Sequence, residues 1–173
     1  AISGGFQMKI YDILSINSIR SKVKSANKKQ LLQDIANIAS EHVGIPYMNI
    51  AKSLQQREIL GPTGIGNGVA IPHVKLRGLT KIFGFFSSLE RPIDFEAADK
   101  QPVDLVFTLL APEDNSGTEH LKALAMVSRM FRHVQANPTK FAETTYAVCV
   151  VPTGTYTNRK NDAHESQNRS SFR

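Results

Sequence analysis

The strongest limit on the fold of this chain comes from one apolar run. Residues 103–111 read Val-Asp-Leu-Val-Phe-Thr-Leu-Leu-Ala, with a single charged side chain. A strand with one face in water alternates apolar and polar residues, whereas a nearly continuous apolar run is typical of a strand covered on both faces. The chain is therefore expected to build a sheet with other elements packed on each side, and Pro112 should end this strand.

Strand and helix patterns alternate along the rest of the chain. Strand formers gather in three further segments: 19–23, which a short helix or turn should precede, 69–71 and 80–89. Capping residues and helically spaced apolar residues predict three helices: from Asn27 to Gly44, from near Asn49 to Gly61, and behind the capping box Ser116-x-x-Glu119. Arg91-Pro92 is expected to break the strand before it. This alternation favours an α/β fold.

Length and composition indicate one globular domain. A chain of 173 residues with 41% hydrophobic content can form a single core. No apolar run reaches the length of a membrane-spanning helix, and no basic segment followed by an apolar one opens the chain. A single cysteine, Cys149, excludes an intrachain disulfide and a cysteine-based zinc site. A cytoplasmic location is the expectation that follows.

The two ends of the chain differ from its middle. Residues 1–7 precede Met8 and resemble an expression-vector remnant, while 154–173 are almost wholly polar and are expected to be disordered. The predicted domain therefore covers 8–153. The formal net charge of +6 includes basic residues of this tail. No dense basic run calls for nucleic acid, and a basic face can equally meet an acidic protein partner.

A glycine-rich stretch carries the candidate chemistry. Four glycines, at 61, 64, 66 and 68, are followed by a short apolar run, then Pro72 and His73. Glycines let backbone amides approach an anion closely, and such a loop next to a histidine suits phosphoryl transfer. The loop is not a dinucleotide fingerprint, because Val69 stands where a third glycine is needed. It is not a P-loop either, because Asn67 replaces the lysine.

Each candidate residue also has an ordinary structural interpretation. A histidine such as His73 is often partly buried without a chemical role. Arg57, at the end of a predicted helix, has the position of a solvated arginine that favours a helix C-terminus. His120 falls in the first turn of the last predicted helix, where an exposed polar residue is common and a charged imidazole is disfavoured.

The residues from Thr63 to His73 read Thr-Gly-Ile-Gly-Asn-Gly-Val-Ala-Ile-Pro-His. This string resembles the active-site motif of the enzyme IIA components of the bacterial phosphotransferase system, in the mannitol, fructose and nitrogen-regulatory branch. Residues 109–132 are especially similar to the nitrogen-regulatory members. The resemblance covers 8–132 and ends there. It departs from the family pattern at Pro62, where serine is usual, and at Val74, where glycine is usual.

The resemblance implies a fold and a site. The fold would be a mixed parallel and antiparallel sheet with helices on both faces, and His73 would be the phosphorylated residue, with His120 as a second active-site histidine. Arg57 could supply positive charge. The loop residues are expected to cradle the phosphoryl group with their amides: Gly64, Gly66, Asn67 and Gly68. No cofactor and no metal is expected, and His42 and His133 are assigned to helix surfaces.

The function that the resemblance implies is regulatory. A phosphocarrier protein would donate the phosphoryl group to His73, and the phosphorylation state would regulate other proteins, such as transporters or sensor kinases. Two alternatives stay open. The chain could be a sugar-specific IIA that relays the phosphoryl group to a IIB domain, or a ligand sensor that is never phosphorylated.

Overall fold

The computed structural model describes residues 8–114 and 118–136, the side chains of 133–136 excepted. The elements below lie in a compact unit, Ala1–Phe131, while of a second unit, Arg132–Arg173, only the end of the last helix is described. The predicted remnant at 1–7 and the predicted tail at 154–173 lie outside the described residues, so the domain limits of 8 and 153 stay predictions. No helix in the described part of the chain is long and apolar enough to cross a membrane.

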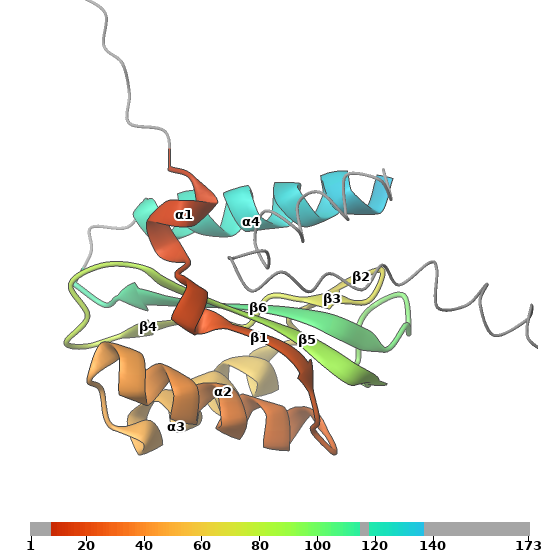
Figure 1. Ribbon diagram of the computed structural model, residues 1–173, viewed down its shortest axis with the longest axis horizontal. Coiled ribbons are helices and arrows are strands. Elements are labelled where there is room, and N and C mark those ends of the chain that lie inside the picture. Colours follow the sequence, from red (N-terminus) through yellow and green to blue (C-terminus); the bar gives the residue numbers. More distant parts are fainter. Residues whose placement is uncertain (1–7, 115–117, 137–173) are drawn as a thin grey trace, which may run out of the picture. The chain divides into compact units, whose positions relative to one another are not determined.

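Strands and helices alternate along the chain, as the sequence predicts (Figure 1). The helical elements are α1 (Ile10–Ile13), the 3-10 turn η1 (Ile16–Ser18), α2 (Lys28–Val43), α3 (Tyr47–Leu60) and α4 (Glu119–Ala136). The strands are β1 (Ile19–Val23), β2 (Gly64–Gly66), β3 (Val69–Ala70), β4 (His73–Leu76), β5 (Phe83–Ile93) and β6 (Val103–Pro112).

The strands form one mixed sheet around β6. Its order is β1-β5-β6-β3-β2, and β4 also pairs with β6. Strands β3 and β4 run parallel to β6, whereas β5 is antiparallel to it and parallel to β1. Every residue of β6 except Asp104 is buried. The prediction of a strand covered on both faces is thus confirmed, and so is the mixed sheet.

Helices cover both faces of the sheet, α2 and α3 on one and α4 on the other (Figure 1). Because side chains alternate along a strand, Val106 and Leu110 of β6 join the core under α2 and α3. Phe107 faces the other way. Its ring lies 6.4 Å from that of Phe86 and 6.3 Å from that of Phe131 on α4, measured between centroids. The resulting single α/β domain confirms the expected fold class.

Most element limits follow their sequence signals. The side chain of Asn27 caps α2 by accepting a hydrogen bond from the amide of Gln30 at 2.9 Å, and Gly44 ends the helix at a φ of 71°. Helix α3 begins at Tyr47, earlier than expected, because Pro46 occupies its N-cap. Ser116 lies outside the described residues.

One predicted strand end is wrong. Strand β5 continues through Arg91-Pro92 to Ile93 instead of breaking there. Its pairing with β6 shifts register between Ser88 and Ile93. Proline lacks an amide hydrogen, so it can stand inside a strand at such an irregularity, where it is not needed as a ladder donor.

Candidate active site

The site begins where one strand is interrupted. Strands β3 and β4 lie along β6 in a single register, with Ala70 opposite Val106 and His73 opposite Leu109. Between them stand Ile71 and Pro72, both buried. Pro72 has no amide hydrogen to give to a ladder. The amide of Ile71 donates away from β6, to the carbonyl of Thr63 at 2.9 Å, and its carbonyl is bonded to the side chain of His73.

The hydrogen bond to Ile71 fixes the ring of His73. Nδ1 lies 2.8 Å from the carbonyl oxygen of Ile71. A carbonyl only accepts, so Nδ1 must carry the hydrogen, and in the neutral ring Nε2 then holds the lone pair. Burial lowers the pKa of His73, and the positive charge of Arg57 and the nearby imidazole of His120 lower it further. The hydrogen bond to Ile71 and the charge of Glu58 raise it. The neutral, nucleophilic form is therefore favoured at neutral pH.

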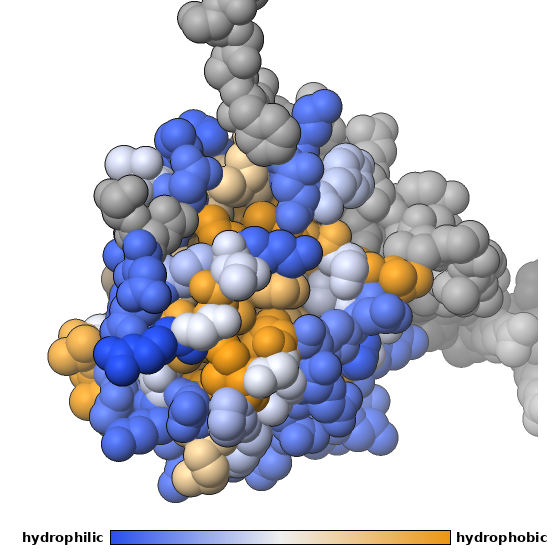
Figure 2. All heavy atoms as spheres, turned by 90° about the vertical axis from the view of Figure 1, so that its left-hand side faces the viewer, coloured by the Kyte–Doolittle hydropathy of each residue, from blue (hydrophilic) through white to orange (hydrophobic). Residues whose placement is uncertain are grey.

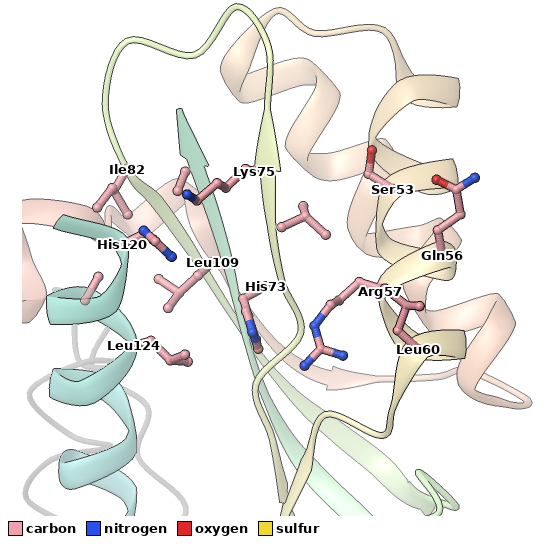
Figure 3. Close-up of a pocket in the computed structure, with 13 residues that line it drawn as sticks. Ser53, Gln56, Arg57, Leu60, His73, Lys75, Ile82, Leu109, His120 and Leu124 are labelled. Carbon is pink, nitrogen blue, oxygen red and sulfur yellow. The ribbon is translucent and has the colours of Figure 1, made fainter. Parts of the chain in front are cut away.

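His73 lines a cavity of about 380 Å³ that also takes in Arg57 and His120. Side chains reach it from α3, β4, β6 and α4 (Figure 3). Its other lining residues are Ser53, Gln56, Leu60, Val74, Lys75, Ile82, Leu109, Ala111, Ala123 and Leu124. Figure 2 looks onto the end of the molecule where β4 ends and α4 begins, and apolar residues gather there inside a hydrophilic rim. The sequence-predicted trio of Arg57, His73 and His120 thus meets in one largely apolar hollow.

Arg57 serves two purposes in this arrangement. Its Nη1 donates to the carbonyl of Gly61 at 2.8 Å, which satisfies a backbone group just past the end of α3. That contact is the ordinary role of an arginine at a helix C-terminus. The same guanidinium lies beside His73 and lines the cavity (Figure 3). The contact to Gly61 supports the structural interpretation, and the position beside His73 keeps the chemical one as a prediction.

His120 enters from the first turn of α4. Its Nδ1 is buried and has no hydrogen-bond partner among residues 8–114 and 118–136. Burial lowers the pKa of His120, and the positive charge of Lys75 lowers it further. Both effects favour a neutral ring, which offers one donor and one acceptor. A neutral donor that faces the cavity suits contact with a phosphoryl oxygen.

Three polar residues that line the cavity are not among the predicted site residues: Lys75, Ser53 and Gln56. Lys75 stands two residues after His73 in β4, and residues at that spacing share one face of a strand. Ser53 lies four residues before Arg57 on α3, which places the two on one helix face. Both could have been found from the sequence by carrying strand and helix periodicity outward from the predicted residues.

The glycine loop does not reach the cavity. The four loop residues lie in β2 and in the turn before β3, whereas His73 follows β3: Gly64, Gly66, Asn67 and Gly68. The amide of Asn67 donates to Oδ2 of Asp99 at 2.7 Å, and this bond lowers the pKa of the Asp99 carboxyl. One amide of the expected phosphoryl cradle thus donates to a carboxylate, and none of the four loop residues lines the cavity. Their role as a cradle stays a prediction.

His42 stands apart from the cavity. His42 is half-buried rather than on an open helix surface: its Nδ1 lies 2.9 Å from the carbonyl of Ile38, and its ring meets that of Phe85 edge to face. The side chain of His133 lies outside the described residues. Within residues 8–114 and 118–136, no group of three or more His, Cys, Asp or Glu side chains could hold a metal ion.

Known proteins match both the sequence and the fold. Residues 12–138 match the family described as "Phosphoenolpyruvate-dependent sugar phosphotransferase system, EIIA 2". A nitrogen regulatory protein of Bradyrhizobium diazoefficiens is 46% identical over 152 residues, which cover 86% of this chain and 99% of the relative. A nitrogen regulatory protein of Escherichia coli is 41% identical over 123 residues, 70% of this chain and 75% of the relative.

A solved structure agrees with these matches. The crystal structure of nitrogen regulatory protein IIA-Ntr from Neisseria meningitidis has a TM-score of 0.68 and 31% identity, and the match covers 81% of this chain and 90% of that one. The family match reaches residue 138, beyond residue 132, where the resemblance was expected to end. The chain therefore belongs to the EIIA type 2 family of the phosphoenolpyruvate-dependent phosphotransferase system, and its curated relatives include nitrogen regulatory proteins.

Proposed function

We propose that this chain accepts a phosphoryl group on Nε2 of His73 from a phosphocarrier protein, and that its phosphorylation state regulates partner proteins in the cytoplasm. One observation carries the proposal: the bond from Nδ1 to Ile71 leaves the Nε2 lone pair on a residue that lines a cavity beside Arg57. A neutral imidazole whose Nδ1–H donates a hydrogen bond keeps a lone pair on Nε2 and can act as a nucleophile.

The transfer step is balanced at His73. The lone pair of Nε2 attacks phosphorus and forms the N–P bond, while the bond from phosphorus to the donor's side chain breaks and returns its electron pair to the donor. The hydrogen on Nδ1 stays in its bond to Ile71. Such a transfer needs positioning and charge stabilisation above all. Arg57 and Lys75 offer positive charge, and His120 offers a neutral donor.

The nitrogen regulatory relatives, at 46% and 41% identity, support a regulatory role over that of a simple relay. The physical basis is the change in charge. Phosphorylation adds roughly 1.5 to 2 negative charges to a hollow whose lining is mostly apolar. A partner that buries unmodified His73 is then repelled, and one that offers arginines is attracted. Transporters and sensor kinases are the expected kinds of partner.

The site also permits one alternative of a different class. A cavity of about 380 Å³ falls within the range of small-molecule pockets, so an unphosphorylated ligand sensor is the second candidate. A sugar-specific relay that passes the phosphoryl group to a IIB domain is the third. It shares the first half of the proposed mechanism and differs only in the acceptor.

The test has two stages. The chain is incubated with phosphoenolpyruvate, enzyme I and phosphocarrier, and its mass is followed with each component omitted in turn. We expect a single acid-labile, base-stable phosphoryl group that appears only when all components are present. Unmodified and phosphorylated chains then serve as bait in cytoplasmic extract. No phosphorylation would favour the ligand sensor, and phosphorylation followed only by transfer to a IIB domain would favour the relay.

A further inference from the structure

Glu58 is a buried carboxylate next to the active site but absent from the cavity lining. It follows Arg57 in the last turn of α3, and only 7% of its surface is exposed. Its Oε1 accepts from the amide of Thr63 at 3.0 Å, and its Oε2 accepts from the hydroxyl of Thr63 at 2.5 Å. Lys28 lies 3.5 Å from the same carboxylate. Burying a charge is costly unless it is paired and bonded in this way.

The residue held by Glu58 leads to His73 through two further hydrogen bonds. The carbonyl of Thr63 accepts from the amide of Ile71 at 2.9 Å. The carbonyl of Ile71 accepts from Nδ1 of His73 at 2.8 Å. Thr63 and Ile71 are themselves buried, with 4% and 1% of their surfaces exposed. A continuous set of short contacts therefore runs from the carboxylate of Glu58 to the imidazole.

We propose that Glu58 is a positioning residue for His73: through Thr63 and Ile71 it holds the acceptor that keeps the hydrogen on Nδ1 and leaves Nε2 free. The proposal rests in part on the proposed function, since positioning matters there for phosphoryl transfer. Charge-assisted bonds to a carboxylate are shorter and stronger than neutral ones, which suits a fixed anchor. Pro72 adds to the rigidity, because it restricts Ile71 to an extended conformation.

Glu58 acts on the imidazole of His73 through its negative charge, in addition to the hydrogen bonds that it accepts from Thr63. It raises the pKa of His73, whereas Arg57 and His120 lower it. When the N–P bond forms, Nε2 gives up electron density and the ring gains positive character. The carbonyl of Ile71 and the negative charge of Glu58 then stabilise the hydrogen on Nδ1. Glu58 thus opposes loss of that proton at the stage where the ring is most acidic.

The first measurement needs no partner protein. We expect ¹⁵N shifts of the His73 ring to show the Nδ1–H tautomer in the parent chain and a population of the Nε2–H tautomer in Glu58→Gln. The titration midpoint of His73 should fall in this variant, because a negative charge that raised it is gone. Glu96→Gln is the matched control. Glu96 also pairs with Lys28, at 3.4 Å, but its side chain is 72% exposed, and it should leave both readings at parental values.

The second measurement is the rate of phosphorylation by the phosphocarrier. Loss of a group that orients an active-site ligand typically costs 10- to 100-fold in activity at metal sites, and we expect a loss of roughly that size for Glu58→Gln per folded molecule. Thr63→Val removes only the hydroxyl contact to Glu58 and should lose less. Thr63→Ser keeps the hydroxyl and should therefore show the parental rate and tautomer.

The outcomes separate the two proposals. Parental tautomer and titration midpoint in Glu58→Gln, with a rate within twofold of the parent, would overturn the role of Glu58. If Glu58→Gln does not fold, identical tautomers and rates in Thr63→Val and Thr63→Ser would overturn it instead. A parent chain that shows the Nδ1–H tautomer but never accepts a phosphoryl group would refute the proposed function, while the tautomer readings would still decide the role of Glu58.

Discussion

The two ends of the glycine-rich motif differ in what they contact. At the hairpin end, Asn67 donates its amide to the carboxylate of Asp99, and the amide of Asp104 donates to the carbonyl of Gly68 at 3.0 Å. At the other end, His73 lines a cavity that Arg57 and Lys75 also line. The carboxylates of Asp99 and Asp104 lie near Gly66 and Gly68, and basic side chains accompany the histidine. The nearby charges favour an anion at the histidine end.

This difference separates structure from chemistry within one continuous string of residues. Gly66 and Gly68 have φ angles of 94° and 81°, which a residue with a side chain adopts only under strain. They allow the chain to reverse between β2 and β3. At the histidine end, the carbonyl of Ile71, between β3 and β4, accepts from Nδ1 of His73. The glycines serve the turn, and we propose that the bond to Ile71 serves phosphoryl transfer.

The largest expected effect comes from removing the nucleophile. In His73→Ala, phosphorylation by the phosphocarrier should be lost completely. Among the described residues, His73 is the only histidine lining the cavity whose Nδ1 is hydrogen-bonded, which leaves the lone pair on Nε2. Intact-mass analysis measures the incorporation. His42→Gln is the control, since His42 is half-buried against Phe85, away from the cavity, and should keep parental incorporation. Full incorporation in His73→Ala would place the phosphoryl group elsewhere and remove the contrast between the two ends.

The next effect tests the residues that accompany His73. Arg57→Ala and His120→Ala should each slow phosphorylation by roughly 10²–10³, by analogy with the loss of one donor from an oxyanion hole. Stopped reactions at several phosphocarrier concentrations give the rate of each variant. Gln56→Ala, which alters an exposed cavity-lining side chain on the same helix, serves as the comparison. If both variants keep rates within twofold of the parent, their ordinary structural interpretations suffice.

The sequence indicates the fold well because its signals are local. The apolar run at 103–111 identifies the central strand, which is buried in the structure. Asn27 and Gly44 mark the two ends of α2, because each residue caps the helix. The break in β5 was predicted wrongly because proline was considered without its strand partners. A register shift against β6 accommodates Pro92, and pairing between distant strands cannot be read from composition.

The site was predictable only in part for a similar reason. The sequence predicts His73, Arg57 and His120, and one cavity brings the three together. The predicted role of the loop as a phosphoryl cradle requires free backbone amides. Asp99 accepts a hydrogen bond from the amide of Asn67 although it lies 32 positions away, and the sequence gives no sign of this contact. Glu58 was missed because its importance lies in contacts to Thr63 that have no sequence pattern of their own.

A smaller effect concerns pH. His73 must be neutral to attack, and its pKa lies below the ordinary 6.5 because of burial and neighbouring cations. The rate should therefore stay level from pH 8 down to about 6.5 and fall only at lower pH, as the ring takes up a proton. Arg57→Ala removes a positive charge that lowers the pKa of His73. The fall in phosphorylation rate on the acid side should therefore begin at higher pH in this variant. An NMR titration of His73 separates this effect from titration of the donor, and an acid limb that moves to lower pH in Arg57→Ala would contradict the electrostatic account.

The same lowered pKa links pH to stability. Unfolded His73 binds a proton near its ordinary pKa of about 6.5, whereas the folded chain does so only at lower pH. The free energy of unfolding should therefore lose a contribution as pH falls from about 6.5 toward the lowered pKa. His73→Ala should remove that part of the dependence, which denaturant unfolding at several pH values can measure.

The smallest expected effect on rate belongs to the hairpin, and it is the sharpest test of the contrast. Gly66→Ala should lower the free energy of unfolding by about 1–2 kcal/mol, because alanine is strained at a positive φ. Its Cβ would also lie 3.1 Å from Oδ2 of Asp99. Gly44→Ala is the matched control: its φ is 71°, and no atom lies within 4 Å of the added Cβ. Since the hairpin lies outside the cavity, both variants should phosphorylate within twofold of the parent per folded molecule. A tenfold loss in Gly66→Ala alone would mean that the loop amides reach the phosphoryl group during transfer, and the glycine end would then share in the chemistry after all.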